Sequence, residues 1–312
     1  MTVRILGTAG PAGWPEAGCG CVSCERLRSA GEHRSPTRVV LRDGRELPPG
    51  GSAPGVLHAS PDPVPYGGAG PYDVVVFDVS RPETLGRLRR DGLAGDATDV
   101  IAVGLDHRLP SMAELERRLR FWGARAVPDG TEPAGEVPAR PAPPRRTLIL
   151  GGSRSGKSAE AELRLLAEPY VTYVATGPAA GDDPGWRARV AAHVERRPAH
   201  WETVETTDPV PLLREATGCL LIDGIGTWLA AVHDECDGWN GGDVTPRVEE
   251  FVEAWRRTRA RVVAVSDEAG MGVVPATASG RLFRDALGRL NQRLAAESEE
   301  AALVVAGRVV AL

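Results

Sequence analysis

The chain has 312 residues, a formal net charge of −5 and no apolar run close to the roughly 20 residues that span a membrane. A net negative charge provides no basic field to hold nucleic acid or an anionic membrane surface. The amino terminus has no basic-then-apolar secretion signal. We therefore expect a cytoplasmic protein whose partners are small molecules, with no nucleic-acid partner and no membrane span.

Two proline-rich segments divide the chain. Residues 47–71 contain seven prolines and six glycines, which predicts a segment without helices or central strands. Residues 132–144 contain five prolines and have the composition of an extended linker. We predict a domain over 1–130, a linker over 131–145 and a second domain over 146–312.

The first domain has short apolar runs, and two stretches with helical spacing follow the third and the fourth run. This pattern predicts a mixed α/β segment. Three of the five cysteines lie close together at Cys19, Cys21 and Cys24. In a cytosolic chain such spacing indicates metal binding or redox chemistry more than a disulfide framework.

The second domain alternates apolar strands with amphipathic helices. The predicted strands are "TLILG", "VTYVAT", "GCLLIDG", "RVVAVSD" and "AALVVAG". Continuous Val/Leu/Ile strands separated by helices predict an α/β fold with a mostly parallel sheet that helices cover on both faces. A ligand of such a sheet is expected at the carboxyl ends of its strands.

A phosphate-loop motif joins the first of these strands to a helix, which predicts a nucleotide site of the P-loop NTPase type. Lys157 is expected to reach the β- and γ-phosphates and Ser158 to bind Mg²⁺, while the backbone N–H groups of the loop hold phosphate oxygens. The predicted nucleotide-binding residues of the loop are Gly151, Gly152, Ser153, Arg154, Ser155, Gly156, Lys157 and Ser158.

Two residues outside the loop complete the predicted chemistry. Asp223 ends an apolar strand and is expected to hold Mg²⁺ at the end of a neighbouring strand; a turn-capping aspartate is the alternative. His193 shares a helical face with Arg189 and Arg197. Two arginines would attract phosphates and favour an uncharged, nucleophilic imidazole, although an exposed arginine-rich helix fits the same residues.

Six ordered segments then reveal a resemblance. They are "GGSRSGKSAEAE", "YVAT", "RVAAHVERRPAHWETVE", "LLIDGIGTWLA", "SDEAGMGVVP" and "GRLFRDALGRLNQRLA". Residues 146–312 resemble adenosylcobinamide kinase/adenosylcobinamide-phosphate guanylyltransferase. This family phosphorylates adenosylcobinamide with ATP or GTP, then transfers GMP from GTP to the phosphate through a guanylylated histidine. The resemblance implies that His193 is this histidine, and that the chain forms a homo-oligomer.

The resemblance also bears on residues outside the loop. Glu205 is a candidate nucleotide or Mg²⁺ contact, with an exposed strand carboxylate as the alternative. Family members usually have Asn-Glu where this chain has Asp267-Glu268, so an amide contact is lost there. Arg281, Arg284 and Asn291 belong to the last segment, whose members bind phosphate or fasten the helix.

The first domain resembles metallo-β-lactamase-superfamily phosphodiesterases. The resemblance implies that Cys19, Cys21, Cys24 and His107 hold a structural Zn²⁺, a set that suits tetrahedral coordination; incidental reduced cysteines are the alternative. The catalytic His-x-His-x-Asp-His motif of the superfamily is absent from the sequence. We therefore predict a truncated, degenerate α/β domain without hydrolase activity, which acts as a scaffold.

The main hypothesis is a bifunctional enzyme of cobalamin biosynthesis that uses Mg²⁺, ATP, GTP, adenosylcobinamide and its phosphate. One alternative is a phosphate-loop kinase without guanylyl transfer, because Ala192 and Asp267 depart from the family pattern. The other alternative is a non-catalytic nucleotide-sensing module. The full set of Lys157, Ser158 and Asp223 favours an enzyme.

Overall fold

The computed structural model describes residues 3–60, 62, 66, 70–133, 137, 142–177 and 197–312. The chain divides into two compact units. The amino-terminal unit comprises Met1–Ala142 and Leu166–Pro169, and the carboxyl-terminal unit comprises Pro143–Leu165 and Tyr170–Leu312.

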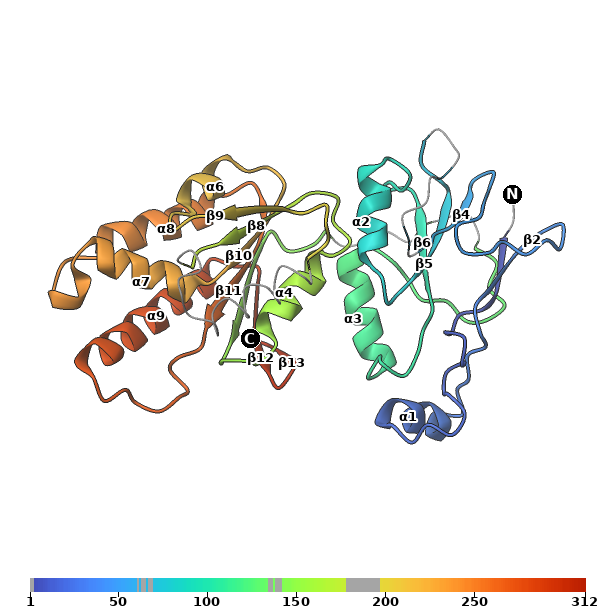
Figure 1. Ribbon diagram of the computed structural model, residues 1–312, viewed down its shortest axis with the longest axis horizontal. Helices are drawn as coiled ribbons and strands as arrows, with labels where there is room; N and C mark the ends of the chain where they lie inside the picture. Colours follow the sequence, from blue (N-terminus) through green and yellow to red (C-terminus); the bar gives the residue numbers. More distant parts are fainter. Residues whose placement is uncertain are drawn as a thin grey trace. The chain divides into compact units, whose positions relative to one another are not determined.

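The carboxyl-terminal unit is built on a seven-stranded sheet with the order β13-β12-β7-β11-β10-β8-β9 (Figure 1). Neighbouring strands from β12 to β9 are parallel, and β13 pairs with β12 in the antiparallel sense. The prediction of a mostly parallel sheet is confirmed. The strands are β7 (Arg146–Gly151), β8 (Val171–Ala175), β9 (Glu202–Glu205), β10 (Cys219–Asp223), β11 (Arg261–Asp267), β12 (Glu300–Val305) and β13 (Arg308–Ala311).

Helices lie on both faces of this sheet. Helix α4 is on one face, and α7, α8 and α9 gather on the other (Figure 1). Side chains alternate along the strands accordingly. Leu148 and Leu150 belong to the core beneath α7, α8 and α9, and Ile149 between them is buried outside that cluster. The described helices are α4 (Lys157–Leu165), α6 (Val210–Glu215), α7 (Ile225–Glu235), α8 (Thr245–Arg257), α9 (Ala278–Ala296) and a 3-10 turn, η1 (Gly238–Asn240).

Large aromatic side chains fill the core on the α7–α9 face. Trp228 of α7 and Phe251 of α8 are completely buried, with ring centroids 4.3 Å apart. Burial of one such side chain contributes about 1.5–3 kcal/mol to folding. These rings belong to the same core cluster as the sheet residues Leu220 and Val262.

The amino-terminal unit contains two sheets. A four-stranded sheet has the order β3-β4-β5-β6, and β1 pairs with β2 in a separate antiparallel sheet. Val3 and Ile5 of β1 share one core with Val76 of β5 and Ile101 of β6. The elements are β1 (Val3–Gly7), α1 (Val22–Ala30), β2 (Arg38–Leu41), β3 (Ser52–Ala53), β4 (Val56–His58), β5 (Val74–Asp78), α2 (Glu83–Arg90), β6 (Asp99–Val103) and α3 (Met112–Trp122).

The prediction that residues 47–71 hold no central strand is wrong. Strand β4 lies inside this segment and pairs with β3 on one side and β5 on the other. Its three residues, Val56, Leu57 and His58, are all buried. Prolines precede and follow the strand without entering it. A short apolar run can therefore form a strand even where the surrounding composition favours turns.

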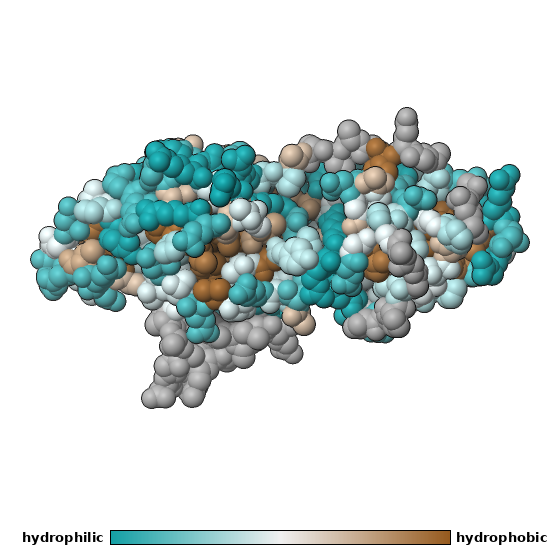
Figure 2. Space-filling view, turned by 90° about the horizontal axis from the view of Figure 1, so that it is seen from above, coloured by the Kyte–Doolittle hydropathy of each residue, from teal (hydrophilic) through white to brown (hydrophobic). Residues whose placement is uncertain are grey.

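Within the described residues, no helix is long and apolar enough to cross a membrane. On the face shown in Figure 2, hydrophilic residues cover most of the surface, and apolar residues are visible in small patches between them.

Candidate active site

The phosphate loop joins β7 to α4, and two of its glycines are required by its shape. Gly156 has φ +99°, a conformation that L side chains rarely adopt. A Cβ on Gly151 would lie 2.8 Å from the carbonyl oxygen of Val304 on β12. The loop can therefore pass close to the neighbouring strand only with glycine at 151.

Neighbouring segments hold the loop through its backbone. The N–H of Glu268, directly after β11, donates to the carbonyl of Gly151 at 3.1 Å. The N–H of Gly307, in the turn between β12 and β13, donates to the carbonyl of Ser155 at 2.8 Å. Hydrogen bonds from both sides fix the loop before any ligand binds.

Lys157 begins α4 and is the only lysine in the chain; the other 36 of the 37 basic residues are arginines. Its Nζ lies 3.2 Å from the carbonyl oxygen of Gly152 and 2.9 Å from Oδ1 of Asp267. A compact ammonium differs from a planar guanidinium in how it meets a phosphate. The occurrence of lysine at this one position agrees with a role that arginine does not fill.

Ser158 of α4 contacts Asp223 of β10, although β7, the strand that leads into α4, is not adjacent to β10. The hydroxyl of Ser158 donates to Oδ1 of Asp223 at 3.3 Å. Strand β11 lies between β7 and β10, so the expectation that Asp223 ends a strand next to the loop strand is wrong. Both residues project from the carboxyl edge of the sheet, where α4 brings the serine to the carboxylate.

Tyr173 on β8 belongs to the site, although the sequence did not indicate it. Its phenol donates to Oδ2 of Asp223 at 2.5 Å, and the side chain is buried. Burial and the neighbouring carboxylate raise the pKa of Tyr173 above its ordinary value, so the phenol remains a donor at neutral pH. The segment "VTYVAT" does place a polar-tipped aromatic in an apolar strand, but it does not reveal which strand lies beside it.

A second, completely buried group supports the turn after Asp223. Thr176 Oγ1 donates to the carbonyl of Gly224 at 2.6 Å and lies 2.9 Å from Oγ1 of Thr227. These contacts connect the end of β8 to the start of α7. They limit the movement of the Asp223 backbone.

Predicted His193 and its neighbour Arg189 lie outside the described residues. Arg197 is described, and its guanidinium carbon lies 3.3 Å from the centroid of the Tyr173 ring. A cation over an aromatic face is a favourable contact. The residue four positions after His193 therefore contacts the tyrosine that binds Asp223.

Glu205 stands at the carboxyl end of the edge strand β9 and is exposed. In the register of the sheet it pairs with Ala175, which pairs with Asp223. Two strand spacings put its backbone about 10 Å from that of Asp223. Its predicted contact with nucleotide or Mg²⁺ stays a prediction.

The last segment of the resemblance fastens the end of β11 and the loop that follows. Buried Asn291 accepts from Ser266 at 2.6 Å and donates to the carbonyl of Asp267 at 3.0 Å. Arg281 donates to the carbonyl of Ala276, and Arg284 to that of Gly270. These three side chains position the loop over 268–277 against α9.

The oxygen atoms of Ser158 and Asp223 fit a magnesium ion. Mg²⁺ takes oxygen ligands at 2.0–2.1 Å in octahedral geometry, so two adjacent ligands lie roughly 3 Å apart. The separation of 3.3 Å is close to this value. One hydroxyl and one carboxylate leave the other positions for water and phosphate oxygens.

Comparison with known proteins gives the family of the chain. A family model described as "Cobinamide kinase / cobinamide phosphate guanyltransferase" matches residues 147–312, more than half of the chain. The chain belongs to this family. The match includes the phosphate loop, Asp223 and the strand that ends at Asp267.

Curated relatives agree with this family. The "Bifunctional adenosylcobalamin biosynthesis protein CobU" of Salmonella typhimurium is 36% identical over 174 residues, 51% of this chain and 95% of that protein. The protein CobP of Pseudomonas aeruginosa, with the same description, is 40% identical over 172 residues, 52% of this chain and 94% of that protein. CobU of Escherichia coli is 34% identical over 174 residues, 51% of this chain and 95% of that protein.

A second set of candidate site residues lies in the amino-terminal unit, before residue 147, where the match to the family begins. One donor atom each from Cys19, Cys21, Cys24 and His107 lies within 4.8 Å of the other three. Burial raises the pKa of the Cys24 thiol to about 11, whereas a hydrogen bond from the Cys24 N–H lowers that of Cys21. Nδ1 of His107 lies 2.7 Å from the Glu16 carboxylate.

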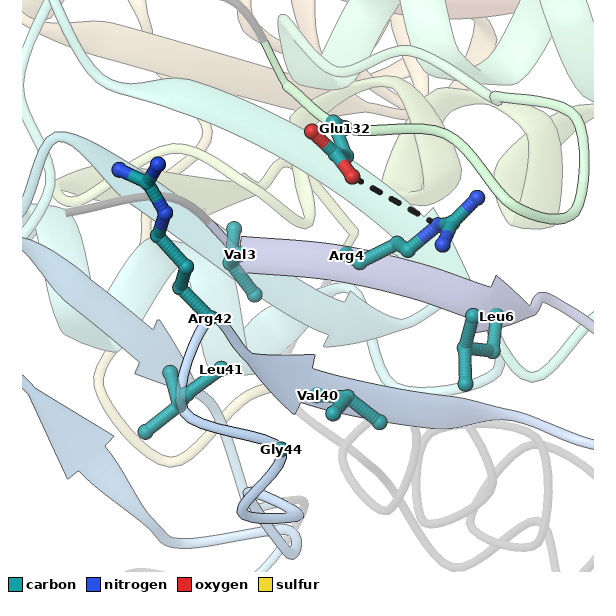
Figure 3. A pocket seen from close by; sticks show the side chains of 8 residues that line it. All are labelled: Val3, Arg4, Leu6, Val40, Leu41, Arg42, Gly44 and Glu132. Carbon is teal, nitrogen blue, oxygen red and sulfur yellow. Dashed lines mark ion pairs between the residues drawn. The ribbon is translucent and has the colours of Figure 1, made fainter.

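The amino-terminal unit also has a hollow of about 540 Å³ over β1 and β2 (Figure 3). Arg4 and Arg42 line it, and Arg4 forms an ion pair of 3.7 Å with Glu132. Both partners of the pair are more than half exposed. The hollow contains none of the predicted site residues.

Proposed function

We propose that the carboxyl-terminal unit phosphorylates adenosylcobinamide with ATP or GTP, then transfers GMP from GTP to the product to form adenosylcobinamide-GDP. Membership of the family supports both reactions. The observation that carries the proposal is the contact of Ser158 with Asp223 at the carboxyl end of the sheet, with Lys157 directly before the serine at the start of α4. These groups suit the binding of a triphosphate and its Mg²⁺.

In the first reaction, the hydroxyl oxygen of cobinamide attacks the γ-phosphorus, the bond to the β–γ bridging oxygen breaks, and the hydroxyl proton is released to water. The backbone N–H groups of residues 151–158 and the ammonium of Lys157 hold the phosphate oxygens in line. Ser158 and Asp223 would hold Mg²⁺, which neutralises charge on the β- and γ-oxygens when bound. Tyr173 keeps the carboxylate of Asp223 directed toward Ser158.

In the second reaction, an imidazole nitrogen of His193 attacks the α-phosphorus of GTP and pyrophosphate leaves. A phosphate oxygen of the first product then attacks the same phosphorus, and the P–N bond breaks. A covalent intermediate divides one displacement into two easier ones. The contact of Arg197 with Tyr173 supports this role, because it ties the segment after His193 to the phosphate site.

The kinase step is tested by product analysis. The full chain with adenosylcobinamide, Mg²⁺ and ATP should give the phosphate, and added GTP should give the GDP derivative, each identified by mass. Lys157→Ala should give neither product from cobinamide, whereas Arg257→Ala, at an exposed position on α8, should match the wild type. Product formation by Lys157→Ala at the wild-type rate would refute the proposed role of the loop.

The presence of Lys157, Ser158 and Asp223 together argues against a module that only senses nucleotide. If the protein is a kinase without guanylyl transfer, it should form only adenosylcobinamide phosphate, even with excess GTP. Supplying adenosylcobinamide phosphate directly separates the two activities, because it bypasses the kinase step. We expect conversion of this phosphate in the presence of GTP.

We further propose that Cys19, Cys21, Cys24 and His107 hold a structural Zn²⁺. A tetrahedral ion with Zn–S bonds near 2.3 Å separates its sulfur ligands by roughly 3.8 Å, and the four donors are close enough to share one ion. Glu16 contacts the imidazole and would orient it, as carboxylates do beside metal-bound histidines. The ion would join α1 to the loop after β6.

Elemental analysis tests this metal site. The wild type and Cys236→Ser, whose change lies in the other unit, should each contain about one zinc per chain, the number that four ligands require. Cys21→Ser should lose most of it. Equal zinc in all three proteins would remove the proposal.

The remaining proposals concern the whole chain. The resemblance of the amino-terminal unit supports a degenerate metallo-β-lactamase-like scaffold. Family resemblance also supports a homo-oligomer, and the composition supports a cytoplasmic location. The exposed Met271, Val273 and Val274, in the loop after β11, offer an apolar surface for a corrinoid or a second copy. Light scattering of the full chain measures the oligomer directly.

A further inference from the structure

The ammonium of Lys157 is paired with a carboxylate at the position where phosphate should bind. Oδ1 of Asp267 lies 2.9 Å from its Nζ. The lysine side chain is only 15% exposed, whereas that of Asp267 is 51% exposed. A ligand from solvent must therefore share or replace this contact before it can reach the lysine.

The backbone at Asp267 is held in place by neighbouring residues. It ends β11, the strand between β7 and β10. Its carbonyl accepts from the amide of buried Asn291, and the next N–H, of Glu268, donates to Gly151 of the loop. These contacts fix the backbone of Asp267, and its half-exposed carboxylate reaches Lys157 from that fixed position.

The pair changes the charge of the site. Lys157 supplies one positive charge, while Asp223 and Asp267 supply two negative charges. A free triphosphate, itself strongly anionic, would be repelled by these two carboxylates while the lysine attracts it. A triphosphate complexed with Mg²⁺ carries two fewer negative charges, and the ion would lie beside Asp223 and Ser158.

We propose that Asp267 makes the phosphate site selective for magnesium-complexed nucleotide by acting as the counter-ion of Lys157. This inference rests on the proposed nucleotide-binding function. Asparagine at this position would leave the lysine without a competing charge. Asp267 is thus a specificity-determining residue of this chain, at the position where its relatives are expected to carry an amide.

The inference is tested by binding, without turnover. The affinity of a fluorescent ATP analogue is measured with Mg²⁺ and with a chelator in its place. Two charges about 5 Å apart and partly screened by water change a binding constant by about tenfold. Asp267→Asn should therefore bind the uncomplexed nucleotide about tenfold more tightly than the wild type, with a smaller change for the magnesium complex.

Two control variants separate charge from structure. Glu268→Gln neutralises the adjacent carboxylate, which bonds to the Gly270 N–H, and should keep the wild-type ratio of the two affinities. Asp267→Glu keeps the charge and should also retain the preference for the complex. The inference, but not the proposed function, would be overturned if Asp267→Asn kept the wild-type ratio of the affinities with and without Mg²⁺. It would also be overturned if Glu268→Gln changed that ratio as much as Asp267→Asn does. A wild type that binds neither form would overturn the proposed function as well.

The single lysine permits a second measurement that needs no nucleotide. An amine-specific reagent can modify only Lys157 and the amino terminus, and mass spectrometry distinguishes the two peptides. Removal of the covering carboxylate in Asp267→Asn should speed modification of Lys157 several-fold, with the amino terminus as the internal reference. Equal rates in Asp267→Asn and the wild type would contradict the pairing.

Discussion

The hydrogen bond between Tyr173 and Asp223 provides the sharpest test of the site's construction. Tyr173→Phe removes one oxygen atom and keeps the ring on which Arg197 lies. A hydrogen bond to a charged group contributes about 1.5–3 kcal/mol. For a unit of this size, that loss should lower the melting temperature by about 3–12 °C.

The effect should depend on pH in a defined direction. The pKa of Tyr173 is raised in the folded protein above its ordinary value of 10.0, so the native state holds the phenolic proton more tightly than the unfolded chain does. The stability from this group is therefore fully present below pH 10.0 and falls as the pH rises above it. The difference between wild type and Tyr173→Phe should be constant from pH 6 to 9 and should narrow above pH 10.

Circular dichroism measures the thermal unfolding of the full chain at each pH. Tyr170→Phe is the matched control, because Tyr170 is 62% exposed. This variant should unfold at the same temperature as the wild type. Tyr173→Phe should also need a higher Mg²⁺ concentration for half-maximal kinase activity, since the carboxylate loses its orientation. Equal melting temperatures for Tyr173→Phe and the wild type throughout would refute the reasoning.

Three further changes have defined outcomes. Gly151→Ala should weaken nucleotide binding at least tenfold in a fluorescence titration, because the new Cβ meets the Val304 carbonyl; wild-type affinity would contradict the loop geometry. Thr176→Val removes one donor to the Gly224 carbonyl, which still accepts from Oγ1 of Thr227, and should cost about 0.5–1.5 kcal/mol in urea unfolding; an unchanged midpoint would exclude that role. A strong chelator should lower the unfolding temperature of the wild type but not that of Cys21→Ser if the cysteine cluster holds zinc.

Local patterns in the sequence predicted that the loop over 151–156 joins a strand to a helix, because its residues are consecutive and its backbone shape requires glycine. The position of Asp223 at the end of an apolar strand was also predicted correctly. Its partner Tyr173 and the pairing of Lys157 with Asp267 depend on the order of strands across the sheet. No single segment of the sequence determines the order of the strands, so these contacts could be identified only from the structure.

Two features of the amino-terminal unit also depend on how distant segments come together in the fold. Strand β4 was missed because proline and glycine dominate its surroundings, although three buried residues were enough to pair with two neighbours. Cys21 and His107 are far apart in sequence, and residue resemblance alone suggested their proximity. The fold brings their donor atoms together, whereas the identity of a bound ion is a matter for elemental analysis.

The central claim is that one phosphate site serves both reactions and that His193 carries the guanylyl group. The most direct measurement is incubation of the full chain with GTP labelled at the α-phosphorus, followed by peptide mapping. An acid-labile label on the peptide that contains His193, absent from His193→Ala and from Lys157→Ala, is the predicted result. No label at saturating GTP, or an equal label in His193→Ala, would contradict the claim.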